Sequence, residues 1–410
     1  MAADGLYFSS EVVGNFAETL DGGSSSSPRE LAASLLRALT PWRSSRSAPP
    51  ISDFRVLGIA LSESTGEAFV GSNLEFPGHP IAITGEWGRG GRGGEVYARG
   101  EREGETGQTQ RRTAHTAPKP VHAEQFAIAN MMGRAIRNDS GGCSLPEISH
   151  IALAVTPCGH CRQMLQELSS APELEVVLIA NEHGEGAAEV EIEKENDAKS
   201  EEGASLFEVH PLRNLLPLAF GPHSVGLLRS DCIPLHVEEA RSELPRGLQR
   251  ACGTGVAGGG NAEGESLLRR KRMPSLACAT PLFSSTMHLS LPSSARDLGD
   301  MAVAAAGMSY APYTGSHSGA AVITRDGVIG AGAYLESAAF NPSIPPLHAA
   351  LIDLMSRRGH SCAEAAGGEI CEAFLCESPD APVRHAASAR ALLSAVAPGV
   401  ELQVVEPWFE

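Results

Sequence analysis

The stretch TPCGHCRQ at Thr156–Gln163 decides how the first half of this chain is organised. It places two cysteines three residues apart after an apolar run, so both thiols can face one point where a strand enters a helix. Upstream, VHAEQ at Val121–Gln125 adds an imidazole and a carboxylate at the start of a helical pattern. Together these groups can hold Zn²⁺ with one position open for water, beside a carboxylate that moves protons.

The candidate zinc ligands are His122, Cys158 and Cys161, and Glu124 is the candidate proton carrier. A helix that begins at the cysteines would stabilise their thiolates through its unpaired N–H groups and its dipole. Zinc lowers the pKa of bound water from about 15.7 to about 7, and Glu124 is close enough in sequence to use that water. A structural zinc or redox site is the alternative interpretation, with His160 as a fourth ligand, although His160 would point off the face that the thiols share.

Size and charge favour a two-domain globular protein with a small ligand. The 410 residues exceed a single domain of roughly 100–200 residues. The formal net charge is −17, whereas proteins that hold nucleic acid by its phosphates normally carry a basic face. The charge therefore argues against a nucleic acid partner and favours a small neutral or cationic ligand.

Cysteine usage and the N-terminus predict the compartment. The nine cysteines are odd in number and have no regular spacing, which is typical of a reducing environment. The first residues lack a basic segment followed by an apolar core, and no apolar run approaches the roughly 20 residues of a membrane span. We therefore expect a cytoplasmic protein without a membrane segment.

Hydrophobic periodicity predicts an α/β fold for the first half. Strand patterns alternate with helical ones, an order that places helices against a sheet. Strands are expected at 54–62, 67–73, 151–155 and 174–180, and helices at 31–39, 121–137 and 161–168. The turn Ser64-Thr65-Gly66 joins the first two strands.

Composition shifts predict the domain boundaries. Four parts are expected, namely a helical and linker segment at 1–49, a zinc domain at 50–222, a linker at 223–290 and a second domain at 291–410. The zinc domain carries insertions at 86–118 and 182–204, and the linker carries a Gly-rich one at 241–272. These insertions are polar and of low complexity, so we expect no packed core in them.

The second domain is a faint copy of the first. In both, a hairpin and a G-x-x-L-E string precede a histidine, followed by AEQ at His122 and by AAL at His348. A repeat of domain size indicates duplication. Ala350 stands in the place of Glu124, and Cys376 is followed by Glu-Ser-Pro with no second thiol. The copy is therefore predicted to bind no catalytic zinc, which leaves one Zn²⁺ per chain.

Three residues before the zinc motifs are candidates for substrate contacts. Asn73 and Glu75 are two apart on an expected strand, so they share a face, and an amide beside a carboxylate suits sugar hydroxyls. Phe54 begins the preceding strand and could stack on a base. Taken alone, all three are better explained as turn or core residues; their order before the zinc motif is what favours binding.

At this point the chain resembles the cytidine deaminases, in the dimeric branch whose subunits carry an active N-terminal zinc domain and a zinc-less C-terminal copy. H-x-E followed by P-C-x-x-C is the zinc deaminase signature. The resemblance extends to NLEFPG at 73–78, LLPLAFGP at 215–222 and ESAAFNP at 336–342. It implies two tandem three-layer α/β/α domains, each with a mixed five-stranded sheet and helices on both faces, plus an N-terminal helical appendage.

The resemblance also implies roles for individual residues. Glu124 would take a proton from the zinc-bound water and deliver it to ring nitrogen N3, while Asn73 and Glu75 would hold the ribose. The remaining contacts would be base packing by Phe54 and Phe220, a backbone contact from Ala123, the Thr156 carbonyl at the leaving amine, and Ala339 and Phe340 reaching into the partner subunit's pocket. A homodimer follows from that last contact.

The expected function is hydrolytic deamination of cytidine and 2′-deoxycytidine, with water, to uridine and 2′-deoxyuridine in pyrimidine salvage. One alternative is a polynucleotide deaminase that edits cytosine in RNA or single-stranded DNA. Another is a non-catalytic zinc-dependent dimerisation protein.

Overall fold

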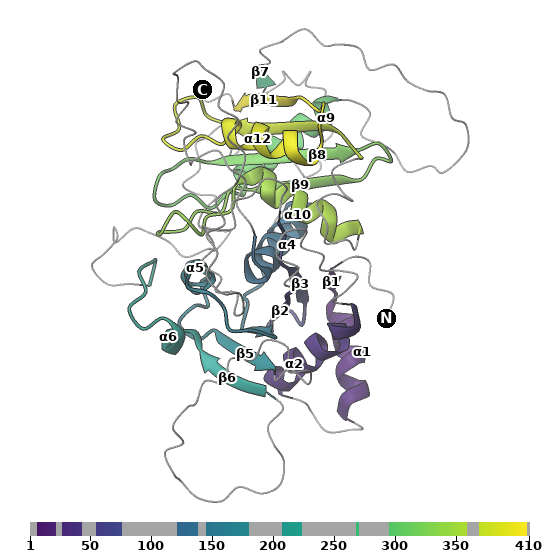
Figure 1. Cartoon of the computed structure of the whole chain (residues 1–410), viewed down its shortest axis with the longest axis vertical. Helices are drawn as coiled ribbons and strands as arrows, with labels where there is room; N and C mark the ends of the chain where they lie inside the picture. The colour runs from purple at the N-terminus through teal and green to yellow at the C-terminus, as the bar shows by residue number, and fades with distance from the viewer. Residues whose placement is uncertain are drawn as a thin grey trace, which may run out of the picture.

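The structure is a computed structural model that describes residues 6–21, 27–42, 55–75, 121–137, 145–179, 207–223, 268–269, 295–358 and 369–407. Within these ranges the chain forms two mixed β-sheets, each covered by helices, which follow one another along the long axis of the molecule (Figure 1). The expected insertions at 86–118 and 182–204 and the base-stacking candidate Phe54 lie outside the described residues. So does 241–272 apart from Leu268–Arg269.

The first sheet has six strands in the order β1-β3-β2-β4-β5-β6. Its strands are β1 (Tyr7–Phe8), β2 (Leu57–Leu61), β3 (Ala68–Ser72), β4 (His150–Leu153), β5 (Glu175–Ile179) and β6 (Phe207–Pro211). Only β4 and β5 pair in parallel among these neighbours. A parallel pair needs a long crossover, which α5 (Gly159–Met164) and the 3-10 turn η3 (Leu165–Glu167) supply.

Helices cover both faces of the first sheet. Helix α4 (Ala123–Arg137) packs on β3 and β2, and α2 (Pro28–Leu39) packs on β2, β4 and β5 from the other side (Figure 1). Strands β2 and β3 are buried throughout, as expected for strands between two helical layers. The closest approach is at Gly71, where a Cβ would lie 1.8 Å from the Ala123 carbonyl oxygen, so only glycine lets α4 rest directly on β3.

The second sheet has five strands in the order β7-β11-β10-β8-β9. They are β7 (Leu268–Arg269), β8 (Ser318–Thr324), β9 (Ile329–Ala333), β10 (Ile370–Glu377) and β11 (Leu402–Pro407). Helices α9 (Ala295–Gly307) and α10 (Pro346–Arg358) take opposite faces. Gly319 of β8 lies against α9, whereas Gly332, which pairs with the next residue of β8, lies against α10.

The two sheets confirm the duplication expected from the sequence. In both, an antiparallel hairpin is followed by an antiparallel third strand and a parallel fourth, β3-β2-β4-β5 in one and β9-β8-β10-β11 in the other. Helix α12 (Ala386–Val396) follows β10 as α5 follows β4. Leu74 and Leu335, which occupy equivalent positions, each form an isolated antiparallel bridge beyond the hairpin. The expected two tandem α/β domains are therefore present.

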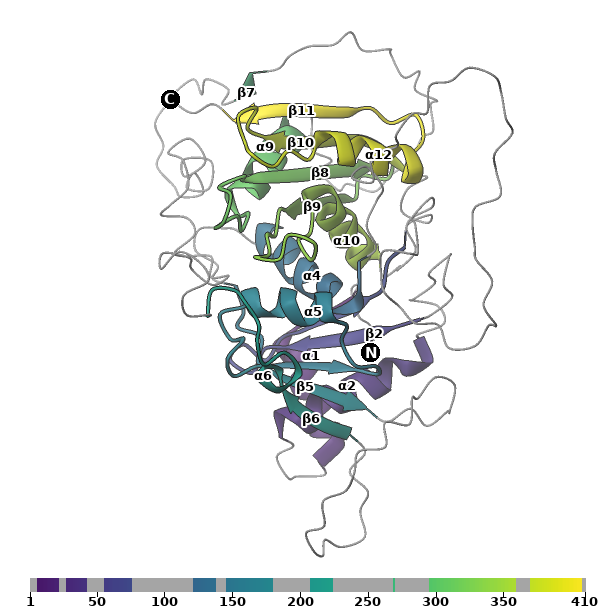
Figure 2. The same cartoon turned by 60° about the vertical axis from the view of Figure 1, so that its left-hand side comes forward.

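The domains meet through α4 and α10, which pack side by side between the sheets (Figure 2). Gly133 of α4 makes room for Asp353 of α10, since a Cβ there would lie 2.7 Å from its carboxylate. One buried apolar cluster runs through both domains. The second domain is thus fixed against the first by a shared core.

The N-terminal segment and the edge of the sheet differ from the expectation. Residues expected as an appendage do form helices, α1 (Ser10–Asp21) and α2, but α2 buries its apolar stripe against the sheet and β1 extends it. The first sheet therefore has six strands instead of five. Strand β6 was not expected; it has only five residues and ends at a proline, which cannot donate a hydrogen bond to a sheet.

The described helices include none that is both long enough and apolar enough to cross a membrane.

Candidate active site

The two predicted motifs meet at the carboxyl end of β4. After β4 the chain turns through Thr156 and Pro157 into α5, whose N-cap is Cys158, and Cys161 lies buried in its first turn. His122 immediately precedes α4. Carboxyl ends of strands are where ligands bind in α/β sheets, because loops and helix starts converge there.

The three predicted ligands lie close enough to share one metal ion. The Nδ1 atom of His122 is 3.4 Å from the Sγ atom of Cys158, and one ligand atom from each of the three residues lies within 4.8 Å of the others. A tetrahedral zinc with Zn–S near about 2.3 Å and Zn–N near about 2.0 Å separates nitrogen and sulfur by about 3.5 Å. In the part of the chain that the structure describes, no other three His, Cys, Asp or Glu side chains bring their ligand atoms this close together. His160 does not belong to the cluster, and its side chain is exposed.

Charge in this cluster suits a divalent cation. A hydrogen bond from the Cys161 thiol lowers the pKa of Cys158 to about 3, with help from His122. Burial raises the pKa of Cys161 well above its usual value. One thiolate and one thiol therefore face the imidazole, and a metal would displace the remaining proton because thiolate is the ligand form.

Glu124 lies beside this cluster without belonging to it. It occupies the first turn of α4 and is 5% exposed. Burial raises the pKa of its carboxyl group, although His122 and the Cys161 thiol lower it in part. A carboxyl group placed beside the cluster can accept and return a proton, as general acid–base catalysis requires.

Within the described residues of the second domain there is no such cluster. His348 is 3% exposed in α10, Ala350 occupies the position of Glu124, and Cys376 is fully buried at the end of β10. Beyond Cys376, the Glu377 carboxylate accepts a hydrogen bond from the His385 amide at 2.6 Å, at the start of α12. In this part of the copy, the Glu377 carboxylate therefore binds the backbone at the start of α12.

Asn73 and Glu75 follow β3 toward the site. The strand ends at Ser72, one residue earlier than expected, and the Asn73 Oδ1 atom accepts the Val56 amide hydrogen at 2.9 Å. Leu74 then bridges to Val121, the residue before His122. Asn73 and Glu75 are both half-buried and flank this bridge, which brings them next to a ligand-bearing segment.

Other candidate residues are fixed by α5. Arg162 donates to the Pro157 and Leu215 carbonyls at 2.7 and 2.9 Å, and Gln163 donates to the Phe220 carbonyl. These hydrogen bonds hold the segment that carries Phe220 against α5. Phe220 itself is 37% exposed. Ala123 is buried at the start of α4, and Thr156 is exposed just before the cysteines.

The loop with Ala339 and Phe340 touches the zinc domain of its own chain. Gln125 donates to the Pro342 carbonyl at 2.7 Å, and the Ala338 amide donates to Glu167 at 2.8 Å. Sequence reasoning missed Gln125 and Glu167 as contributors. Their only signal was position, since Gln125 ends VHAEQ and Glu167 follows TPCGHCRQ by four residues.

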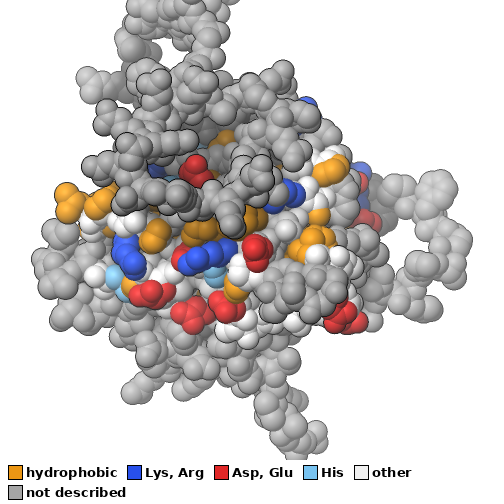
Figure 3. Space-filling model, turned by 90° about the horizontal axis from the view of Figure 1, so that it is seen from below, with side chains coloured by type: hydrophobic (Ala, Val, Ile, Leu, Met, Phe, Trp, Pro, Cys, Tyr) orange, Lys and Arg blue, Asp and Glu red, His pale blue; other side chains and the backbone are white. Residues whose placement is uncertain are grey.

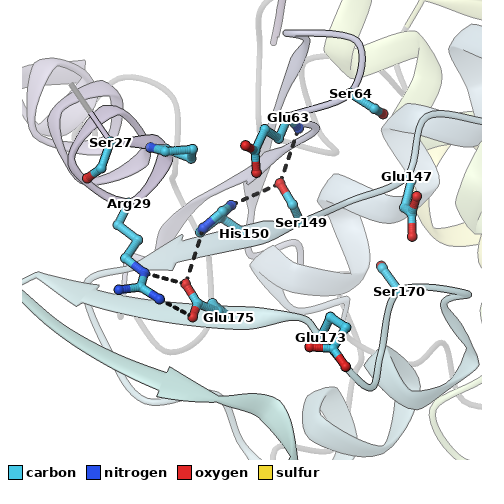
Figure 4. Close-up of a pocket in the computed structure, with 11 residues that line it drawn as sticks. Ser27, Arg29, Glu63, Ser64, Glu147, Ser149, His150, Ser170, Glu173 and Glu175 are labelled. Carbon is cyan, nitrogen blue, oxygen red and sulfur yellow. Dashed lines mark hydrogen bonds and ion pairs between the residues drawn. The ribbon is translucent and has the colours of Figure 1, made fainter. Parts of the chain in front are cut away.

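A cavity of about 820 Å³ lies at the other end of the strands (Figure 4). Its wall includes His150 and Glu175 at the amino ends of β4 and β5, and Arg29 of α2 pairs with Glu175 there at 2.5 Å. His150 lies 3.3 Å from the same carboxylate. These groups satisfy one another and lie at the opposite strand ends from the cysteines, so the cavity is separate from the candidate active site.

Comparisons with known proteins agree with the geometry. Residues 35–177 and 263–390 each match a family model described as the cytidine and deoxycytidylate deaminase zinc-binding region. The chain is similar to cytidine deaminase 6 of Arabidopsis thaliana, at 29% identity over 87% of this chain and 86% of that protein. Cytidine deaminase 1 of the same plant is 29% identical, covering 90% and 89%. A cytidine deaminase of Photobacterium profundum is 26% identical, covering 90% and 81%.

These relatives span both domains, and the matching regions contain both ligand segments. The chain is therefore a hydrolytic deaminase and belongs to the cytidine and deoxycytidylate deaminase family, with two zinc-binding-region domains in tandem.

Proposed function

We propose that this enzyme converts cytidine and 2′-deoxycytidine, with water, to the corresponding uridines and ammonia. The observation that carries the proposal is the buried Glu124 carboxyl beside the His122, Cys158 and Cys161 cluster. A metal site of three protein ligands keeps a position open for water, which distinguishes a catalytic from a structural zinc. We propose one Zn²⁺ per subunit, in the N-terminal domain only.

Glu124 is the group that moves protons in this scheme. When bound, Zn²⁺ supplies the chemistry of lowering the pKa of a water molecule to about 7. Glu124 holds the proton released there and delivers it to ring nitrogen N3, which makes C4 more electrophilic. It then assists departure of the C4 amino group as ammonia. Burial raises the pKa of its carboxyl group, which supports this role because general acid–base catalysis requires a group that both accepts and returns a proton.

The residues around the cluster would hold the nucleoside. Asn73 and Glu75 would bind the ribose hydroxyls, since an amide and a carboxylate offer both donors and acceptors. Their position beside the Leu74–Val121 bridge supports this proposal. The base would be held by Phe54, Phe220, the Ala123 backbone and the Thr156 carbonyl.

A homodimer would complete the pocket, with Ala339 and Phe340 entering the site of the partner subunit. Phe340 supports this arrangement, because 55% of it is exposed and its φ of 56° is uncommon for a bulky residue. An exposed aromatic group held in that conformation suits a surface that another molecule covers.

The cysteines bear on the cellular setting of the enzyme. Cys158, Cys161 and Cys376, which lie within the described residues, form no disulfide, which supports a reducing compartment such as the cytosol. Pyrimidine salvage is the pathway class that consumes free cytidine and deoxycytidine.

A polynucleotide substrate is less well supported. On the face shown in Figure 3, the acidic and basic side chains of the described residues are interspersed and form no basic groove. The net charge of −17 points the same way.

A spectrophotometric assay of the purified zinc-loaded protein tests the proposal. Cytidine and 2′-deoxycytidine should each be converted with release of ammonia, whereas cytosine within a single-stranded oligonucleotide should not react. Conversion of the oligonucleotide in preference to the free nucleosides would refute the substrate assignment. Absence of any deamination by protein that contains zinc would refute the catalytic function itself.

A further inference from the structure

The buried carboxylate of Glu167 joins the segment that follows α5 to the C-terminal domain. Glu167 is fully buried in η3, six residues after Cys161. Its Oε2 atom accepts hydrogen bonds from the hydroxyls of Tyr310 and Tyr313 at 3.1 and 2.5 Å, and its Oε1 atom accepts from the Ala338 amide at 2.8 Å. All three donors belong to the C-terminal domain. Hydrogen bonds from that domain therefore replace the water that a buried carboxylate has lost.

A second contact ties the same loop to the other ligand segment. Gln125 is 7% exposed in the first turn of α4. Its Oε1 atom accepts the His122 amide hydrogen at 3.2 Å, while its Nε2 atom donates to the Pro342 carbonyl at 2.7 Å. One side chain therefore contacts both the backbone of a candidate zinc ligand and the copy's loop.

The loop between the two contacts is strained and points outward. Phe340 has a φ of 56°, the only positive value for a non-glycine residue within the described ranges. Internal bonds hold it, with the Ser343 amide donating to its carbonyl at 3.0 Å and the Ser337 amide donating to the Ser343 hydroxyl at 2.9 Å. Such strain persists where the surroundings over-determine the conformation, and it concentrates at functional sites.

From these contacts we propose that Gln125 and Glu167 are positioning residues: they clamp loop 336–343 of the zinc-less domain onto the two segments that carry the zinc ligands. The clamp fixes the positions of Ala339 and Phe340, the two residues of this loop that are proposed to contact the nucleoside. The expected effect of the clamp on kinetics rests on the proposed function, whereas the contacts that form the clamp do not.

Simple adhesion between the domains does not require this arrangement. The shared apolar core around α4 and α10 already joins them. Apolar residues of similar volume hold an interface as well as buried charged groups do, or better. A buried carboxylate placed between the segment that follows α5 and a strained loop is better explained by the need to fix one geometry.

The test compares Glu167→Ala and Glu167→Gln with Glu377→Ala. Glu377 is a matched control, because it is a buried glutamate, 1% exposed, that accepts a backbone amide within the C-terminal domain. Measurements are zinc per chain, KM and kcat for cytidine, and hydrogen exchange of the peptide covering 335–344.

For Glu167→Ala we expect a KM raised about tenfold, a kcat within about threefold of the wild type and unchanged zinc. Exchange in 335–344 should be faster by about tenfold, because the loop loses its anchor. Glu167→Gln keeps an acceptor oxygen and should restore KM to within about threefold. Glu377→Ala should leave KM and loop exchange unchanged even if it lowers Tm.

If Glu167→Ala does not fold, Tyr310→Phe and Tyr313→Phe provide the test, since each removes one hydroxyl donor and keeps the ring. Their combination should raise KM by about threefold or more. Unchanged KM and loop exchange in these variants, or equal effects in Glu377→Ala, would overturn the clamp. Loop exchange requires no substrate, so a wild type that fails to deaminate cytidine would refute the proposed function and leave the clamp test intact.

Discussion

The two domains share the order of five strands and the placement of the helices on them, yet among the residues that the structure describes only the first domain holds a candidate metal site. At the candidate site the difference lies in a few side chains: Ala350 stands in the place of Glu124, and the chain after β10 carries no counterpart of the Cys158–Cys161 pair. Packing of helices on glycine-containing strands maintains both folds. Catalytic groups contribute little to that packing, so one copy could lose them without losing its architecture.

The helix that follows the third strand shows the difference most clearly. In the first domain, Cys158 is the N-cap residue of α5, and a hydrogen bond from the Cys161 thiol stabilises its thiolate. In the copy, Glu377 accepts the amide of His385, the N-cap of α12. Both domains thus place an anionic group at a helix N-terminus, where the dipole favours it. Only the thiolate is also a soft zinc ligand.

Of the substitutions that test this comparison, Glu124→Gln should have the largest effect, which is a fall in kcat. The amide cannot carry the proton, so we expect kcat to fall by about 10² to 10⁴ while zinc per chain stays unchanged. Glu377→Gln removes a buried carboxylate from the copy and should leave kcat near that of the wild type. A Glu124→Gln enzyme with wild-type turnover would contradict the assigned role.

Removal of the metal should affect only the first domain. Metal binding stabilises the folded state by mass action, so a chelator should lower the Tm of the wild type. Cys158→Ala lacks a ligand and should show no chelator response, whereas Cys376→Ala should respond like the wild type. Differential scanning fluorimetry measures all three, and a chelator response that persists in Cys158→Ala would place the metal elsewhere.

Restoring the missing acid in the copy should not restore a site. Ala350 is fully buried, and α10 lies so close to the sheet that a Cβ on Gly332 would be 2.1 Å from the Ala350 nitrogen. Ala350→Glu should therefore destabilise the protein by about 1–3 kcal/mol by overpacking. The control Ala387→Glu, at an exposed position of α12, should change stability by less than about 0.5 kcal/mol. Denaturant unfolding distinguishes them.

The smallest expected effect concerns how the outer helices are held. Helix α9 rests directly on Gly319 of the copy, whereas α2 is tied to the first sheet by the exposed Arg29–Glu175 pair. Hydrogen bonds from Arg29 hold the pKa of Glu175 below its usual value. Arg29→Ala should therefore lower Tm only slightly at neutral pH, because solvent screens exposed pairs.

The pH dependence of that difference has a definite sign. A depressed pKa in the folded state gives stability that is present above the unfolded pKa, about 4.3 for glutamate, and is lost as pH falls through the folded value. The Tm gap between wild type and Arg29→Ala should therefore close below about pH 4. A gap that widens on acidification would contradict this account of the pair.

The sequence predicted the site better than its surroundings. Local patterns sufficed for the ligand motifs, for α4 and for the hairpin turn at Gly66, whose φ of 69° favours glycine. Strand β1 has only two residues, and its pairing with β3 depends on tertiary contact. The links from Gln125 to Pro342 and from Glu167 to Tyr313 join residues more than 140 positions apart, and no local pattern encodes them.

The asymmetry between the domains is tested most directly by counting zinc in the purified wild-type chain and in Cys158→Ala by elemental analysis. We expect one zinc per chain in the wild type and none in the variant. Two zinc ions in the wild type would show that the copy binds metal, and one zinc that survives the loss of Cys158 would show that this thiol is not a required ligand; either result would contradict the account.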